Sequence, residues 1–156
     1  MSLVITLAVS NRGKGQQPMR GAKDVEAYLG RANRQYTPVE DQPGTYLVPC
    51  GDGMPPIALR VEPPLVVLRV HVGDVPKGDP TELFRQLLAL NARNQVHASF
   101  GLEGERIVLT AALELENLDY NEMEAALDEI DLTLGQQVPS LQKMWKSAES
   151  QRPSKK

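Results

Sequence analysis

The strongest constraint on this chain is a change of hydrophobic period within residues 79–145. Apolar residues recur there at helical spacing, then alternate every second residue through two short runs, and then return to helical spacing. This order predicts a helix, a β-hairpin and a second helix, each with one apolar face. Since an apolar face must be buried against another element, the stretch predicts helices packed on a sheet.

The first of these helices has start signals at Asp79 and Pro80. We expect Asp79 to accept a hydrogen bond from a free backbone N–H group, Pro80 to take the first helical position, and Glu82 to complete a capping box. The apolar face that follows is wider than a single contact needs. Its members are Leu83, Phe84, Leu87, Leu88 and Leu90.

The hairpin is expected to begin at Val96 and to turn at Glu103 and Gly104, after which the alternation resumes. The second helix is expected to begin at Asp119, which forms a capping box with the glutamate three residues later. Pro139 is expected to kink or end that helix near residue 138, because proline lacks an N–H group and its ring clashes with the preceding turn.

The residues before this stretch predict a short helix followed by three or four strands. The helix covers residues 21–33, and strand-like runs occupy residues 36–40, 45–49, 57–62 and 65–72. The whole pattern predicts an α+β domain with a mainly antiparallel sheet, helices on one face, and the order α-β-β-β-α-β-β-α.

Composition divides the chain into three segments. Residues 1–20 are expected to form an N-terminal strand, from the apolar run at residues 3–9, or a flexible segment. Residues 21–145 are expected to form a single domain, because this length is sufficient to bury a hydrophobic core. Residues 146–156 are rich in Ser, Lys, Gln and Pro without periodicity, and are expected to be a disordered tail.

Charge and composition weigh against two classes of partner. The 156 residues carry a net charge of -3 and only 4% aromatic residues, whereas nucleic-acid surfaces need clustered Lys and Arg and aromatic stacking platforms. No run approaches the ~20 apolar residues of a membrane span. The single Cys50 can form no internal disulfide, which suits a reducing compartment. We therefore expect a soluble, cytoplasmic protein that binds neither nucleic acid nor membrane.

Residues around Lys14 partly match a phosphate-binding loop. Gly13 and Lys14 fit the motif, but Ala8 stands at its first glycine and Gly15 stands where a magnesium-binding hydroxyl is required. The following residues do not begin a convincing helix that would offer free N–H groups to a phosphate. An edge strand followed by a linker is therefore the favoured interpretation.

No constellation of residues predicts catalysis. His71 and His97 have no metal-ligating neighbour at a suitable spacing, and Cys50 has no fixed base near it in the sequence. The acidic residues of the last helix lack the turning, glycine-containing segment of a calcium loop, so we expect them to form a solvated face. They are Glu122, Glu124, Asp128, Glu129 and Asp131. We expect no catalytic residue, no metal and no cofactor, and hence no enzyme.

Two apolar surfaces remain as candidate binding sites. One is the wide apolar arc of the helix that follows Pro80, and the other lies among polar residues on the second face of the sheet. Surfaces of this kind are typical of partner or dimer interfaces, although single exposed apolar residues are common. The residues predicted for a protein-binding or dimer interface are Leu65, Val67, Leu83, Phe84, Leu87, Leu88 and Val108.

The order of apolar positions also resembles a known family. The resemblance rests on the run LLALN at residues 87–91, the segment 96–102, the hairpin 106–113, and the pair Leu118 and Asp119 that opens an acidic helix. On these residues the chain resembles the YbjN-like proteins, which are related to the CesT/Tir-type chaperones of type III secretion. The resemblance covers the order of elements over residues 22–141. It implies a fold that commonly dimerises and binds other polypeptides without a cofactor, and it carries no catalytic motif.

Two functional hypotheses follow from these observations. The leading one is a non-enzymatic protein-binding module, chaperone-like or regulatory, that acts as a homodimer and binds another polypeptide such as an effector or a regulatory partner. The alternative is a small-ligand sensor or signal-transduction regulatory domain with a pocket between helices and sheet. The sequence offers no polar cluster that would fix the orientation of such a ligand.

Overall fold

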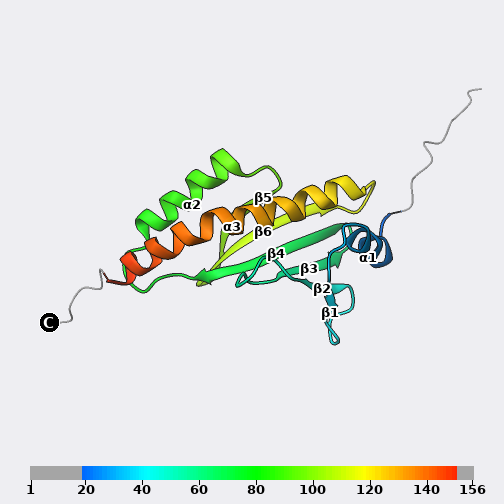
Figure 1. The fold of residues 1–156 in the computed structure, drawn as a ribbon, viewed down its shortest axis with the longest axis horizontal. Coiled ribbons are helices and arrows are strands. Elements are labelled where there is room, and N and C mark those ends of the chain that lie inside the picture. Colours follow the sequence, from blue (N-terminus) through cyan, green and yellow to red (C-terminus); the bar gives the residue numbers. More distant parts are fainter. Residues whose placement is uncertain (1–18, 151–156) are drawn as a thin grey trace, which may run out of the picture.

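A six-stranded antiparallel sheet and three helices make up the described part of the chain, residues 19–150 of a computed structural model (Figure 1). The helices are α1 (Ala22–Arg31), α2 (Thr81–Asn94) and α3 (Tyr120–Ser150). The strands are β1 (Thr37–Pro38), β2 (Thr45–Val48), β3 (Ile57–Glu62), β4 (Leu65–Asp74), β5 (Ala98–Glu103) and β6 (Arg106–Glu114). Their order across the sheet is β1-β2-β3-β4-β6-β5, which confirms the predicted α+β class and leaves β5 at one edge.

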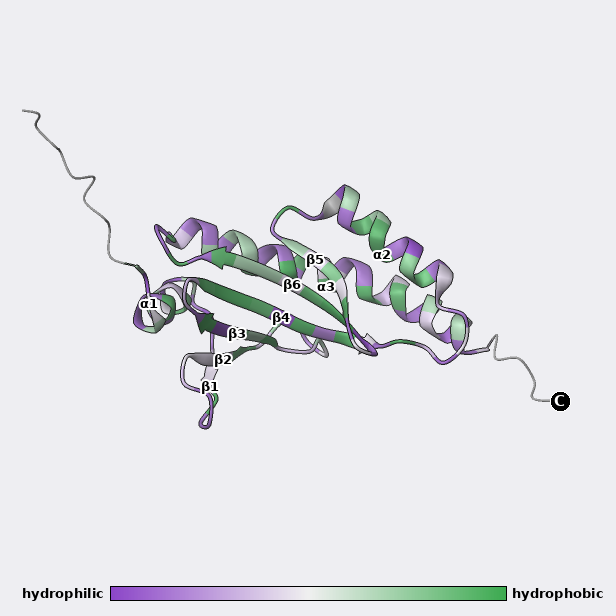
Figure 2. Cartoon of the chain, turned by 180° about the vertical axis from the view of Figure 1, so that it is seen from behind, coloured by the Kyte–Doolittle hydropathy of each residue, from purple (hydrophilic) through white to green (hydrophobic). Residues whose placement is uncertain are grey.

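The hydrophobic core lies between one face of the sheet and the helices. Alternation along β4 and β6 turns their apolar side chains to this face, and Figure 2 shows hydrophobic residues along both central strands. Each of the three helices contributes an apolar stripe to the same core. The buried helix residues include Val25, Leu29, Leu83, Leu87, Leu90, Met123, Leu127, Ile130 and Leu134. Since each such side chain stabilises the fold by ~1.5–3 kcal/mol, this face fixes the architecture.

Four strands precede α2, and the first of them is very short. β1 holds only Thr37 and Pro38 and pairs with β2 at the edge of the sheet. Pro38 has no N–H group to donate to a further neighbour, which suits an edge position. The three longer strands β2, β3 and β4 account for the predicted order α-β-β-β-α-β-β-α.

The start of α2 differs from the expected capping box. The helix begins at Thr81, and Pro80 is the residue that precedes it. Asp79 is one position too far out to cap the first turn, so its Oδ1 accepts hydrogen bonds from the Thr81 backbone N–H (3.0 Å) and hydroxyl (2.6 Å). Glu82 lies beside Arg85 at 3.6 Å, as an ion pair on the helix surface.

The β5–β6 hairpin differs from its prediction at both ends. Val96 is 84% exposed and precedes the strand, which begins at Ala98. The turn consists of Gly104 and Glu105, because Glu103 pairs with Arg106 and Gly104 takes a φ of 59° that favours glycine. Because the turn lies one residue further along the chain than predicted, each residue of β5 pairs with a β6 residue two positions from the expected one. Side chains alternate between the two faces of a strand, so a shift of two residues leaves every residue on the face predicted for it.

Of the two outcomes expected at Pro139, a kink or an end of the last helix, the end does not occur, and the helix runs past Trp145, where the domain was expected to finish. α3 continues through Pro139 to Ser150. Its final turns are fixed by tertiary contacts, because the Trp145 Nε1–H donates to the Asp74 carbonyl oxygen (2.6 Å) and Ala148 is buried. These contacts offset the loss of one backbone hydrogen bond at proline.

Several sequence predictions fall outside the described residues. The apolar run at residues 3–9 and the partial phosphate-loop match at Gly13 and Lys14 lie in residues 1–18, and the rest of the expected tail lies in residues 151–156. Within residues 19–150, none of the helices combines the length and the apolar character that a membrane crossing requires.

Two glycines provide a matched test of how α3 packs. A Cβ atom at Gly78 would overlap the backbone of Ala148, so Gly78→Ala should lower the free energy of unfolding by about 1–3 kcal/mol. Gly135 lies within α3 with open space around it, so Gly135→Ala should raise that free energy by about 0.5–1 kcal/mol. Denaturant titration followed by the fluorescence of Trp145, the only tryptophan, measures both changes. Equal stability of the two variants would contradict this packing.

Candidate functional site

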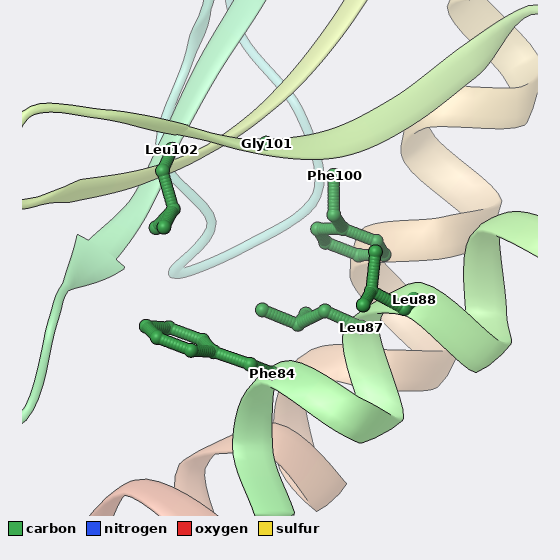
Figure 3. Close-up of a pocket in the computed structure, with 6 residues that line it drawn as sticks. All are labelled: Phe84, Leu87, Leu88, Phe100, Gly101 and Leu102. Atoms are coloured by element: carbon green, nitrogen blue, oxygen red, sulfur yellow. The ribbon is translucent and has the colours of Figure 1, made fainter. Parts of the chain in front are cut away.

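A groove of about 300 Å³ opens between α2 and the edge strand β5 (Figure 3). It is lined on the helix side by Phe84, Leu87 and Leu88, and on the strand side by Phe100, Gly101 and Leu102. None of these residues carries a polar side chain. The groove is therefore suited to apolar groups.

The groove has a buried floor and an exposed rim. Leu87 and Phe100 are buried, whereas Leu88 is 68% exposed and Leu102 is 56% exposed. In Figure 3, Leu102 points from the strand toward Phe84 on the helix, and Phe100 lies beside Leu87 and Leu88. Large apolar side chains left in water at the rim of an apolar groove are typical of a protein interaction site.

The groove follows from the width of the apolar arc on α2. Leu83, Leu87 and Leu90 are buried in the core, and the remaining width of the arc places Phe84 and Leu88 over β5. Since β5 is an edge strand, no further strand from residues 19–150 covers this side. A helix with a narrower apolar face would leave no groove here.

The Asn91 side chain pairs with the backbone of β5 at the groove. Its Nδ2–H donates to the carbonyl oxygen of Phe100 (3.0 Å), and its Oδ1 accepts from the Phe100 backbone N–H (2.7 Å). Both backbone groups of Phe100 on the free edge are therefore satisfied by one side chain from α2.

The loop between α2 and β5 is held by Glu129 of α3. The Glu129 carboxylate accepts hydrogen bonds from the backbone N–H groups of Val96 (2.8 Å), His97 (2.9 Å) and Ala98 (3.2 Å). It also lies 2.7 Å from the Nδ1 of His97. The side chain of Glu129 is only 14% exposed. This contact fixes where β5 begins relative to α3.

The electrostatics of Glu129 reflect these contacts. Burial alone would raise its pKa, but the hydrogen bonds from the backbone of His97, Val96 and Ala98 and from the His97 side chain outweigh burial and lower the pKa. The predicted solvated acidic face is therefore wrong for Glu129. This role was not predictable from the sequence, because the three N–H donors lie about thirty residues away along the chain.

Comparison with protein families decides the relationship. The CesT_Tir_1 family model matches residues 19–147, which is most of the chain. The chain belongs to the CesT_Tir_1 family. This membership confirms the resemblance to CesT/Tir-type chaperones noted in the sequence. A search among curated proteins found no match.

Two solved structures share the fold of this CesT_Tir_1 protein. One is a chain of the heterodimeric ExoU–SpcU complex from the type III secretion system of Pseudomonas aeruginosa, with a TM-score of 0.59 and 18% identity over 74% of this chain and 95% of that chain. The other is YbjN from E. coli, described as a putative transcription regulator, with a TM-score of 0.59 and 12% identity over 79% of this chain and 95% of that chain. At these identities the likeness establishes the fold.

The cysteine of this CesT_Tir_1 chain lies beside an ion-pair cluster. Arg34 bridges Asp128 (2.7 Å) and Asp131, so two further members of the predicted solvated face are paired. Burial, followed by the hydrogen bond to Asp131, raises the pKa of the Cys50 thiol to about 12. A thiol that stays protonated at neutral pH is a poor nucleophile.

Each of the two histidines contacts a different carboxylate. His71 Nε2 is 3.0 Å from Asp74 Oδ1, and His97 pairs with Glu129. Within residues 19–150, no group of three or more His, Cys, Asp or Glu side chains is placed to hold a metal ion.

The seven predicted interface residues fall into three places. Phe84, Leu87 and Leu88 meet in the groove, whereas Leu83 is buried in the core. The remaining three occupy the opposite face of the sheet, where Leu65 and Val67 are half-buried. Val108 is buried there, beneath the Arg69–Glu103 ion pair (2.9 Å) that spans β6. The strand side of the groove, Phe100, Gly101 and Leu102, was missed because the sequence does not show which strand lies at an edge.

Glu129→Gln tests the contact that positions β5. Loss of the charged acceptor should lower the free energy of unfolding at pH 7 by about 1–3 kcal/mol. Because the pKa of Glu129 is lowered, this stabilisation is complete above the ordinary value of 4.5 and is lost as the pH falls through the folded-state value. The difference between wild type and variant should therefore shrink below pH 4.5, as measured by urea titration from pH 7 to pH 3.

Glu149→Gln is the matched control for this measurement, because Glu149 is an exposed residue of the same helix. It should leave stability unchanged within about 0.5 kcal/mol. A Glu129→Gln effect that does not change with pH would contradict the role given to the carboxylate.

Proposed function

We propose that this chain is a non-enzymatic, chaperone-like protein-binding module that acts as a cytoplasmic homodimer and binds another polypeptide in the α2–β5 groove. The observation that carries the proposal is the groove itself, which has an apolar floor, an exposed apolar rim and no polar side chain in its lining. A site of this chemistry binds apolar side chains and has no group for bond-making chemistry.

Family membership and one similar structure support a polypeptide as the ligand. The chain belongs to a family of secretion-chaperone type, and the ExoU–SpcU structure is described as a heterodimeric complex from a type III secretion system. The description of YbjN as a putative transcription regulator favours a regulatory form of the same proposal. The small-ligand alternative receives less support, because specific small-molecule sites combine apolar walls with a few convergent polar groups.

Leu88→Asp and Leu102→Asp test the groove. Each places a charge on the apolar rim, and the pair should weaken binding of the native polypeptide partner by at least about tenfold, since apolar contacts at an interface centre often contribute more than 1 kcal/mol. Affinity capture from the native lysate with quantitative mass spectrometry identifies the partner, and titration then measures the change. Leu132→Asp is the control, because Leu132 is 60% exposed but lies on α3 outside the groove. Equal loss in the control and the groove variants would contradict the proposal.

The homodimer is tested separately. The chain has a mass of 17.2 kDa, so light scattering coupled to gel filtration should report a particle of twice that mass at micromolar concentration. Dilution should shift the mass toward one chain if the interface is small. A mass of one chain at every working concentration would remove the dimer from the proposal.

A further inference from the structure

A second cavity lies between α3 and the end of β4. Its volume is about 610 Å³, roughly twice that of the α2–β5 groove, and small-molecule sites commonly measure ~300–1,000 Å³. On α3 it is lined by Gln142, Lys146 and Glu149. These residues lie on a different side of the helix from Met144 and Ser147, which face α2. The cavity is therefore separate from the groove.

Contacts within the chain hold the walls of this cavity in place. The Trp145 ring packs against Gly73, where a Cβ atom would lie 2.9 Å from the ring carbon Cζ2, so the close approach depends on glycine. The Trp145 Nε1–H donates to the Asp74 carbonyl oxygen (2.6 Å), and Figure 1 shows the last turns of α3 beside the end of β4. Two turns earlier, Val138 of α3 is buried. Because these contacts involve no ligand, the cavity is formed before anything binds.

The lining of the cavity combines apolar and polar side chains. Val72, Val138 and Trp145 provide apolar walls, and Lys77 and Lys146 are exposed polar residues of the same lining. Sites for small molecules pair apolar walls with a few polar groups that fix the orientation of the ligand. The six residues that line the α2–β5 groove carry no polar side chain, so this chemistry distinguishes the two sites.

The charged groups of the lining favour a negatively charged ligand. Within residues 19–150, neither Lys77 nor Lys146 forms an ion pair. Of the two carboxylates in the lining, that of Asp74 lies 3.0 Å from the Nε2 of His71, which leaves Glu149. Two ammonium groups therefore share one carboxylate without a contact of its own. Since an ammonium group only donates hydrogen bonds, a carboxylate is a suitable further partner.

We propose that the cavity between β4 and α3 binds a small organic anion with an aromatic body and one carboxylate group. The aromatic body lies against Trp145 and the valines, where it gains from burial of apolar area and from contact between rings. The carboxylate lies between Lys77 and Lys146. This site is separate from the α2–β5 groove, so the inference goes beyond the proposed function and can fail without it.

Three probes with the same naphthalene ring test the chemistry of the site. They are 2-naphthylacetate, 2-(2-naphthyl)ethanol and 2-(2-naphthyl)ethylamine, which at neutral pH are an anion, a neutral molecule and a cation. The readout is the NMR signal of the Trp145 indole N–H in the full chain, which is a single signal because the chain has one tryptophan. The anion should shift this signal with saturation and bind about fivefold or more tightly than the alcohol, and the amine should bind more weakly than the alcohol.

Salt separates the contribution of charge from that of the ring. Raising sodium chloride from about 50 mM to about 500 mM should reduce the advantage of the anion over the alcohol, because salt screens exposed charges. Equal binding of anion and alcohol, or tighter binding of the amine, would overturn the choice of an anion. An indole signal that none of the three probes shifts at its highest soluble concentration would remove the site.

Charge variants test the named residues. Lys77→Met and Lys146→Met keep most of the apolar stem and remove the charge, so each should weaken binding of 2-naphthylacetate about twofold or more. Glu149→Gln removes the competing carboxylate and should strengthen that binding about twofold. Lys143→Met is the matched control, because Lys143 is an exposed residue of α3 that does not line the cavity. An equal loss in Lys143→Met, or weaker binding in Glu149→Gln, would overturn the inference.

A groove variant separates this site from the proposed function. Leu88→Asp places a charge on the rim of the α2–β5 groove and should leave the affinity for 2-naphthylacetate unchanged. Lys77 and Lys146 are exposed, so their variants should keep the unfolding midpoint of the wild type, which excludes misfolding as the cause of a loss. A loss of probe binding in Leu88→Asp as large as in Lys146→Met would place the probe in the groove and overturn the inference, while the groove would remain a binding site.

Discussion

The packing of α3 along the apolar face of the sheet is the interaction on which the rest of the structure depends. Its buried residues lie in one core with the central strands β4 and β6. Because α3 is 31 residues long, it spans the sheet in Figure 1 and contacts both α1 and α2. α2 contacts α3 as well as the edge strand β5. The packing of α3 therefore sets the position of α2, and with it the groove.

The polar face of α3 contributes as much to the site as its apolar face. Glu129 holds the loop that starts β5, and Asp128 and Asp131 hold Arg34 in the segment after α1. Carboxylates that accept several hydrogen bonds in a partly buried place rigidify the segments they bind. The acidic helix thus fixes the connections at both sides of the core, while α2 and β5 leave an apolar groove that carries no charge of its own.

Periodicity predicted the elements and their faces, because burial of one apolar face is the dominant local signal. The helix that carries Leu83, the β5–β6 hairpin and the helix after Asp119 all followed from it. Long-range contacts explain what was not predicted. Contacts of Trp145 and Ala148 stabilise α3 beyond Pro139, and the hydrogen bond to Glu129 places the start of β5 at Ala98. The helix side of the groove was predicted, because the wide apolar arc of α2 is visible in the sequence. The strand side was not predicted, because the edge position of β5 depends on the order of strands in the sheet, which the sequence does not show.

Hydrogen–deuterium exchange of the chain with and without its captured polypeptide tests the central claim most directly. If the α2–β5 groove is the recognition site, residues 84–102 should gain protection in the complex, and the rest of the sheet should change little. Protection confined to β2 and β3, or to the opposite face around Leu65 and Val67, would contradict the account.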